Sequence, residues 1–329
     1  MSKKNSYNNI TDLSTHPDDY PYLFKMKDIN VSEIITHSST FSPVIFDGHL
    51  NRDKFDPSVI SELETFDNGY LVIYDNWKDT NHLNSITDLF SESVRVKCNF
   101  KRYLSPIQYW NKHKKYIWTK IAKKDIYKLR EYLYANTKLC NNFRITVALA
   151  ILQIFKPKKW LDISAGWGDR LISAILYGVD LYVAADPNLD LHPCYDRIIQ
   201  TLVPVNKQSN FVIYPTGFEK TPLPNTKFDI VFSSPPFFDI EQYSTHTGDS
   251  LQYSTEKAWC DNFLWPSLIK SYIHLKRNGH MILYMSGSPF VLSYLKKLDK
   301  LMKYKGIIYF MDTRPRSMYV WQKIQNGPM

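Results

Sequence analysis

The chain of 329 residues is long enough to bury a full core, as one large domain with an appendage or as two smaller domains. Apolar residues make up 44% and aromatic residues 15%, with only 11 glycines, which excludes a low-complexity or fibrous protein. No window holds the roughly 18 consecutive apolar residues of a membrane span, and the N-terminus lacks the apolar centre of a signal peptide. We therefore expect an intracellular protein, cytoplasmic or nuclear, without membrane contact.

The cysteines and histidines do not suggest a metal site. The four cysteines, Cys98, Cys140, Cys194 and Cys260, are far apart and form no C-x-x-C motif. None of the nine histidines belongs to a cluster with metal-ligand spacing. We expect no metal, and we expect reduced thiols in the core instead of a disulfide framework.

The first 100 residues read as a smaller α+β region. They hold short β-like runs at 70–74 and 94–98 between turn-rich stretches. They carry 9 Lys and Arg against 15 Asp and Glu, so this part is acidic although the whole chain has a net charge of +9. We predict an N-terminal module over 1–100 with a possible role in target recognition.

The segment 101–140 is predicted to be a basic, mostly helical connector, because Ile126, Leu129 and Leu133 follow helical spacing. Residues 101–138 hold 11 Lys and Arg against 2 Asp and Glu, and the basic residues alternate with aromatic ones. This composition is typical of a surface that contacts phosphates and stacks bases, with Lys114, Lys115 and Trp118 as candidates. The alternative is an amphipathic helix whose aromatic rings face the core.

From residue 141 to 329 helices and strands alternate. Helices are predicted at 143–155, 170–178, 189–203, 255–276 and 291–304, and strands at 160–164, 180–187, 210–218, 227–236, 280–286, 306–313 and 317–324. This order predicts an α/β fold with a mostly parallel sheet covered by helices on both faces. The last two strands have only a short turn between them, so they form an antiparallel hairpin.

Two strand ends carry a pattern that suits a cofactor. The first strand ends in Asp162, Ser164, Gly166, Trp167 and Gly168, where two glycines allow a tight turn and a close approach to a ligand. The second strand ends in Asp186, in the place of a carboxylate that accepts both hydroxyls of a ribose. Together they predict an adenosine-containing cofactor, with capping of the next helix by Asp186-Pro187-Asn188 as the alternative.

The fourth strand ends in Ser234, Pro235, Pro236 and Phe237. We name the stretch Asp162-x-x-x-Gly166-x-Gly168 the glycine loop. The glycine loop, then Asp186, then Ser-Pro-Pro-Phe is an order of motifs that resembles that of the S-adenosylmethionine-dependent amino-methyltransferases of nucleic-acid bases. The resemblance covers about residues 141–324 and implies a Rossmann-like class I methyltransferase domain with S-adenosyl-L-methionine as cofactor. It also implies catalytic roles for the four residues of this turn.

Elementary chemistry supports that role. The lone pair of an exocyclic amine is delocalised into the base, so the amine is a poor nucleophile. The Ser234 hydroxyl and the Pro235 carbonyl would accept its two hydrogens, held rigid because proline fixes φ. Phe237 would stack on a base taken out of its duplex. The alternative is a structural turn with core aromatic residues.

Other positions follow from the same resemblance. Arg144 or Thr146 would hold the methionine end of the cofactor, and Trp167 would flank it. Phe238 and Tyr243 follow the catalytic turn and would contact the substrate, with Asp239 and Glu241 as further members of a lid; a solvated loop is the alternative. Arg314 and Arg316, in the terminal hairpin, would contact phosphates.

The sequence therefore predicts a methyltransferase that modifies the amino group of a nucleic-acid base, with DNA more expected than RNA. Serine in the first catalytic position favours cytosine N4 slightly over adenine N6. An RNA base and a protein glutamine remain open as substrates, because each presents a planar amine. A protein that binds nucleic acid without catalysis is the alternative from another class.

Overall fold

The computed structural model describes residues 30–41, 44–47, 69–74, 83–121, 125–238, 240–243, 252–285, 287–311 and 315–324. Its core is a nine-stranded sheet with the strand order β1-β2-β10-β11-β9-β7-β4-β5-β6. The strands are β1 (Val44–Asp47), β2 (Gly69–Tyr74), β4 (Lys159–Asp162), β5 (Leu181–Ala185), β6 (Phe211–Tyr214), β7 (Phe228–Ser233), β9 (Leu275–Tyr284), β10 (Lys303–Met311) and β11 (Pro315–Gln322).

The pairing of the strands confirms the predicted architecture. The five strands β9, β7, β4, β5 and β6 are mutually parallel, whereas β11 pairs antiparallel with both β10 and β9. The result is a Rossmann-like, mostly parallel sheet with a terminal antiparallel hairpin. In such a sheet the ligand site lies beyond the carboxyl ends of the strands.

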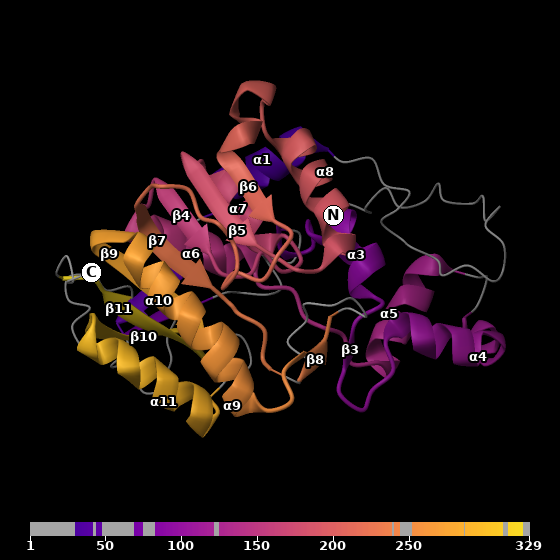
Figure 1. Cartoon of the computed structure of the whole chain (residues 1–329). Coiled ribbons are helices and arrows are strands. Elements are labelled where there is room, and N and C mark those ends of the chain that lie inside the picture. Colours follow the sequence, from indigo (N-terminus) through magenta and orange to yellow (C-terminus); the bar gives the residue numbers. More distant parts are fainter. Residues whose placement is uncertain are drawn as a thin grey trace.

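Helices cover both faces of this sheet (Figure 1). Trp160, Tyr182 and Ile230 pack on one face with α6 (Ile145–Phe155), α7 (Asp169–Tyr177) and α8 (His192–Leu202). Their chain neighbours Leu161, Val183 and Val231 pack on the other face with α9 (Glu256–Trp259), α10 (Trp265–His274) and α11 (Pro289–Lys297). Successive side chains of a strand point to opposite faces, so runs that are apolar throughout fill both cores.

The N-terminal strands do not stand apart from this sheet. β2 pairs parallel with β10 and antiparallel with β1, so the predicted β-run at 70–74 extends the large sheet at its edge. The predicted run at 94–98 is instead the end of helix α3 (Asp88–Arg95) and the turn after it. A physical reason for the first difference is that β10 would otherwise be an edge strand with unpaired backbone groups. The division of the chain at about residue 100 stays a prediction.

The helix predicted over 255–276 is interrupted. It consists of α9, a π-helix Cys260–Leu264 and α10, which ends at His274. Pro266 lies in the first turn of α10 and has no N–H for an i to i−4 hydrogen bond. The Trp265 N–H donates to the Cys260 carbonyl, which closes a wider turn just before the proline.

The basic connector forms a helical hairpin of α4 (Pro106–Lys120) and α5 (Ile126–Asn136), seen beside the sheet in Figure 1. α4 begins with a capping box of Ser105 and Gln108. The hairpin has its own small core, made by Trp110, Ile117, Ile121, Leu129 and Leu133. Apolar contacts within the hairpin therefore stabilise it, in addition to its contacts with α3.

A polar network joins this hairpin to α3. Arg130 of α5 contacts Asp88 at 2.8 Å and Glu92 at 2.5 Å, and Arg95 contacts Asp88 at 2.5 Å. The carboxylates of Asp88 and Glu92 are almost fully buried, so each requires these partners. Arg130, one of the basic residues of the connector, thus stabilises the fold instead of contacting a nucleic acid.

The cysteine prediction is wrong for one pair. Cys98 and Cys140 form a disulfide, whereas Cys194 and Cys260 are free and buried. The two bonded residues are 42 positions apart and meet because β3 (Asn99–Phe100) returns to the segment before α6. The spacing of the cysteines along the chain does not indicate that these two come together.

Among the described residues, no helix is long and apolar enough to cross a membrane.

Candidate active site

The loop between β4 and α7 rests on a buried ion pair. The carboxylate of Asp162 accepts hydrogen bonds from Arg170 Nε and from the Tyr182 hydroxyl, each at 2.8 Å. The Arg170 guanidinium also donates to the Ser164 carbonyl. Because Asp162 has no exposed surface, we assign it the support of this loop instead of the cofactor contact expected from the sequence.

The two glycines of the loop adopt backbone angles that other residues avoid. Gly166 has a φ of +62° and Gly168 a φ of +101°. The Tyr195 hydroxyl of α8 donates to the Gly166 carbonyl and holds the turn from outside. Neither Arg170 nor Tyr195 is among the predicted site residues. Nothing in the local sequence distinguishes Tyr195 from any other tyrosine in a predicted helix.

Replacing Gly168 with alanine is expected to lower the free energy of unfolding by about 2 to 3 kcal/mol. A Cβ at Gly168 would lie 2.7 Å from Ile198 Cδ1, in addition to the unfavourable φ. Gly178→Ala is the matched control, because Gly178 has a φ of +85° but nothing within 4 Å of the added Cβ. Urea unfolding of both variants measures the difference, and equal losses would contradict the clash.

Asp186 lies at the end of β5, and two main-chain N–H groups hold its carboxylate in place. Its Oδ2 accepts the Gly166 N–H at 2.9 Å and its Oδ1 accepts the Asn188 N–H at 3.0 Å. Burial raises the pKa of this carboxyl to about 6, although the two main-chain donors oppose the shift. The cap of the following 3-10 turn is Asn188, whose Oδ1 accepts the Asp190 N–H. The predicted alternative, a cap made by this segment, is therefore present at Asn188, while the Asp186 carboxylate bonds to other main-chain groups.

Ser164 joins this loop to the end of β7. Its hydroxyl donates to the Ser234 carbonyl at 2.9 Å, and its N–H donates to the Ser233 hydroxyl at 3.3 Å. The two predicted motifs, 70 residues apart in the chain, are thus in direct contact. This contact fixes the backbone that carries the Ser234 side chain.

The Ser234 hydroxyl and the Pro235 carbonyl are both available as acceptors. Within the part of the chain that the structure describes, neither has a hydrogen-bond partner. Pro235 is buried and Ser234 is half-buried, so the acceptors lie at the rim of the core. Two fixed acceptors without partners suit a group with two N–H donors.

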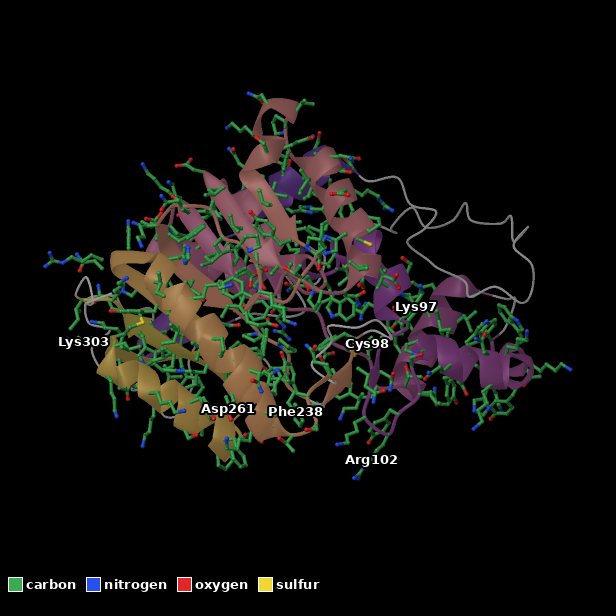
Figure 2. All side chains as sticks on the ribbon, in the orientation of Figure 1. Lys97, Cys98, Arg102, Phe238, Asp261 and Lys303 are labelled. Atoms are coloured by element: carbon green, nitrogen blue, oxygen red, sulfur yellow. A yellow bond between two sulfur atoms is a disulfide. The ribbon has the colours of Figure 1, made fainter. Side chains whose placement is uncertain are left out.

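The aromatic residues of the turn border a cavity of about 230 Å³. The Phe237 ring lies edge-on to Tyr284 with 5.6 Å between centroids. Phe238 has a φ of +40°, which is unusual for a bulky residue, and its ring lies 6.3 Å from that of Trp259 beside α9 (Figure 2). The cavity is lined by Phe237, Phe238, Ile240, Glu256, Trp259, Met285, Ser288 and Val291.

Residues predicted to flank the cofactor divide into two groups. Trp167 is nearly buried, and its ring lies 5.9 Å from that of Tyr243, so the structure brings these two together beside the glycine loop. Thr146 is buried and its hydroxyl and N–H are both bonded to Asn84. Arg144 stands at the N-cap of α6 and is half-buried. The cofactor contacts of Arg144 and Thr146 stay predictions.

Of the hairpin residues predicted to contact nucleic acid, the two lysines are at least partly exposed, whereas the most exposed aromatic rings belong to other residues. Trp118 is half-buried and packs edge-on against Trp110 of the hairpin core, with 5.4 Å between ring centroids. Lys115 is exposed, and Lys114 is half-buried on the same helix. The rings that face solvent are those of Tyr103, Tyr116 and Tyr127, each about half exposed.

Three predictions lie outside what the structure describes. Asp239 and Arg314 are not among the described residues, and of Arg316 only the backbone is described, opposite Phe310. Among the described residues, no group of three or more His, Cys, Asp or Glu side chains could hold a metal ion.

No model of a protein family matches the sequence, and no curated protein matches it. Solved structures with partial likeness to this chain include the following three. TrmN from Thermus thermophilus has 15% identity and a TM-score of 0.42, with 55% of this chain and 49% of TrmN covered. An rRNA methylase from Streptococcus thermophilus has 11% identity and a TM-score of 0.38 (56% and 99% covered). The glycopeptide N-methyltransferase MtfA has 11% identity and a TM-score of 0.40 (54% and 95% covered). The chain thus spans about half the length of TrmN, and a likeness of this degree does not identify a substrate.

Proposed function

We propose that this protein is an S-adenosylmethionine-dependent methyltransferase that acts on the exocyclic amino group of a nucleic-acid base. The observation that carries the proposal is the pair of acceptors at the end of β7, the Ser234 hydroxyl and the Pro235 carbonyl, fixed by Ser164 beside the glycine loop. The resemblance to amino-methyltransferases of nucleic-acid bases favours DNA, with cytosine N4 or adenine N6 as target, and the motif itself also suits an RNA base or a glutamine.

The residues around the glycine loop fit the cofactor. Asp186 would accept the two ribose hydroxyls, since both its oxygens are already oriented by main-chain N–H groups. Gly166 allows close approach, Trp167 would flank the adenosine, and Arg144 would pair with the methionine carboxylate. S-adenosylmethionine, when bound, supplies an activated methyl group on its sulfonium.

The catalytic turn would contribute to the reaction by positioning the amine of the substrate. Ser234 and Pro235 hold the two amine hydrogens, which directs the nitrogen lone pair out of the plane of the base. The amine would gain the methyl group as the bond between methyl and sulfur breaks and a neutral thioether leaves, and one of these hydrogens would then pass to water as a proton. Phe237 and Phe238 provide the aromatic walls against which an extruded base stacks.

The basic hairpin supports nucleic acid as the substrate polymer. Replacing Lys114 and Lys115 with glutamine is expected to weaken binding of a single-stranded oligonucleotide. It should also reduce the slope of log affinity against log salt by about 0.7 for each phosphate that the protein no longer neutralises. Fluorescence anisotropy at several salt concentrations measures both quantities. The matched control is Lys207→Gln with Lys300→Gln, two exposed lysines outside the hairpin. An unchanged slope, or an equal weakening in the control, would exclude this surface.

The proposal is tested by following a labelled methyl group from S-adenosylmethionine into DNA, RNA or protein. Label in DNA or RNA supports a base methyltransferase and identifies the polymer. Label in a protein fraction alone would favour a glutamine substrate. Cofactor binding without transfer to any fraction would argue against the proposal, and absence of cofactor binding would favour a non-catalytic nucleic-acid-binding protein.

A further inference from the structure

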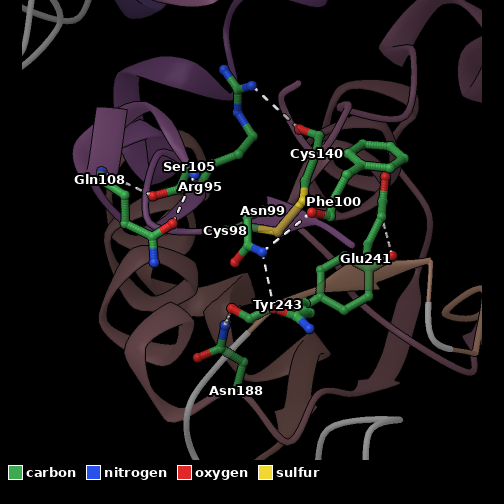
Figure 3. The surroundings of a disulfide bond; sticks show 11 residues. Arg95, Cys98, Asn99, Phe100, Ser105, Gln108, Cys140, Asn188, Glu241 and Tyr243 are labelled. Carbon is green, nitrogen blue, oxygen red and sulfur yellow. Dashed lines mark hydrogen bonds between the residues drawn. A yellow bond between two sulfur atoms is a disulfide. The ribbon is translucent and has the colours of Figure 1, made fainter. Parts of the chain in front are cut away.

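Three segments that are far apart in the sequence meet around the disulfide (Figure 3). Residues 240–243, which we name the strap, follow the catalytic turn. Within the strap, β8 (Glu241–Gln242) pairs antiparallel with β3. The Asn99 amide donates to Gln242 Oε1 at 2.9 Å, and the Lys101 N–H donates to the Ile240 carbonyl at 3.0 Å.

The strap is too short to hold itself in place. A ladder of two residues on each side makes few hydrogen bonds and is not stable in isolation. Its partner β3 is fixed by stronger means, because Cys98, directly before β3, forms the disulfide with Cys140. Lys138, two residues before Cys140, places its Nζ 4.5 Å from the Phe100 ring centroid. The strap therefore depends on a strand that is covalently anchored.

At its other end the strap reaches the predicted cofactor loop. The Tyr243 ring faces Trp167, and the Tyr243 carbonyl accepts a hydrogen bond from the Asn188 amide at 3.3 Å. The N–H of the same Asn188 donates to Asp186. A continuous series of contacts thus runs from the disulfide through β3 and the strap to the carboxylate.

We propose that the Cys98–Cys140 disulfide is a positioning element that holds the strap against the glycine loop and so pre-organises the cofactor site. The proposal rests on the proposed function, since the glycine loop must be the cofactor loop. A segment that is already ordered lowers the entropy cost of ligand binding. A disulfide restricts the disordered alternatives of the chain it joins.

The experiment compares the intact protein with the protein reduced by dithiothreitol. The dithiol becomes a cyclic disulfide as Cys98 and Cys140 become thiols, which mass spectrometry after alkylation verifies. We expect amide hydrogen exchange in 99–101 and 240–243 to become about tenfold faster after reduction. We expect the Kd of S-adenosylmethionine to rise by about 3- to 10-fold. Cys98→Ala, Cys140→Ala and the double variant should show the same two changes without reductant.

Two further variants separate positioning from general stability. Cys194→Ala is the matched control, because Cys194 is buried but free, and it should leave both quantities unchanged. Gln242→Ala weakens the strap and keeps the disulfide, so it should raise the Kd even if a cysteine variant does not fold.

Unchanged exchange after verified reduction, or faster exchange with an unchanged Kd, would overturn the positioning role. Thiols found free in the protein before reduction would overturn it as well. If the intact protein does not bind S-adenosylmethionine, the proposed function fails, and the exchange rates still decide whether the disulfide holds the strap.

Discussion

Replacing Ser234 with alanine is expected to lower kcat for methyl transfer by about 100-fold, the loss typical of removing one preorganised polar partner in an active site. The Kd of S-adenosylmethionine should stay within about twofold, because in the proposed mechanism the hydroxyl binds the amine and not the cofactor. The physical reason is that one amine hydrogen loses its acceptor, so the lone pair stays delocalised in the base. Single-turnover kinetics with a labelled methyl group measures the step directly.

The control for this variant is a serine of similar size outside the site. Ser293→Ala removes an exposed hydroxyl on α11 that bonds to the Phe290 carbonyl one turn earlier. It should leave kcat and Kd unchanged. A Ser234→Ala protein with unchanged kcat would show that the turn at the end of β7 does not grip the acceptor amine.

Replacing Asp186 with asparagine is expected to raise the Kd of S-adenosylmethionine by about 100-fold. Hydrogen bonds to a charged group are worth about 1.5 to 3 kcal/mol each, and asparagine presents an N–H₂ where one ribose hydroxyl needs an acceptor. Calorimetry measures the change. Asp196→Asn, on the exposed side of α8, is the matched control and should bind like the original protein.

The pKa of Asp186 also predicts how binding depends on pH. Burial raises this pKa to about 6 in the ligand-free protein, and the ribose hydroxyls require the ionised carboxylate. Affinity should therefore be constant above about pH 7 and fall by up to about tenfold for each unit below pH 6. The slope should disappear in Asp186→Asn. A slope that persists there would assign the titration to another group.

Stability should change in the opposite sense over a similar range. A carboxyl whose pKa is higher in the folded than in the unfolded state binds a proton on folding, so stability falls as pH rises between the two values. For Asp186 this window runs from about 4 to about 6. Burial raises the pKa of Asp169 to about 7, which extends the loss to about that pH. The contribution of these two carboxyls to stability is thus expected to fall as pH rises from 4 to 7, whereas that of His280, whose pKa burial lowers from 6.5 to about 4, rises between those two values. Denaturant unfolding of the ligand-free protein and of Asp186→Asn at each pH isolates the part due to Asp186.

Much of the sheet could be predicted because local patterns determined it. Apolar runs such as those of β4, β5 and β7 can be satisfied only between two helical layers, and the short connection before β11 forces an antiparallel return. The contact between Ser164 and Ser234 also follows from topology, since β4 and β7 are parallel neighbours whose carboxyl ends meet. Motifs at strand ends were therefore a sound guide to residues that come together.

The remaining features depend on contacts between distant segments. The local sequence does not indicate which residues meet in three of these contacts: the pairing of β2 with β10, the disulfide, and the pairing of the strap with β3. Asp162 matched a cofactor motif, yet its burial with Arg170 and Tyr182 makes it a support. Trp118 matched a base-stacking composition, yet it is half-buried against Trp110 of the hairpin core. In both cases the residue type was compatible with two roles, and only the tertiary contacts distinguished them.

The central claim is that the acceptor pair at Ser234 and Pro235 serves an exocyclic amine of a nucleic-acid base. Mass spectrometry of nucleosides, after incubation of single- and double-stranded DNA and of total RNA with the protein and S-adenosylmethionine, tests it most directly. We predict a nucleoside methylated on its amino group, such as N4-methylcytosine or N6-methyladenine, that is lost with Ser234→Ala. No methylated nucleoside from any of these substrates, although the protein binds S-adenosylmethionine, would contradict the claim.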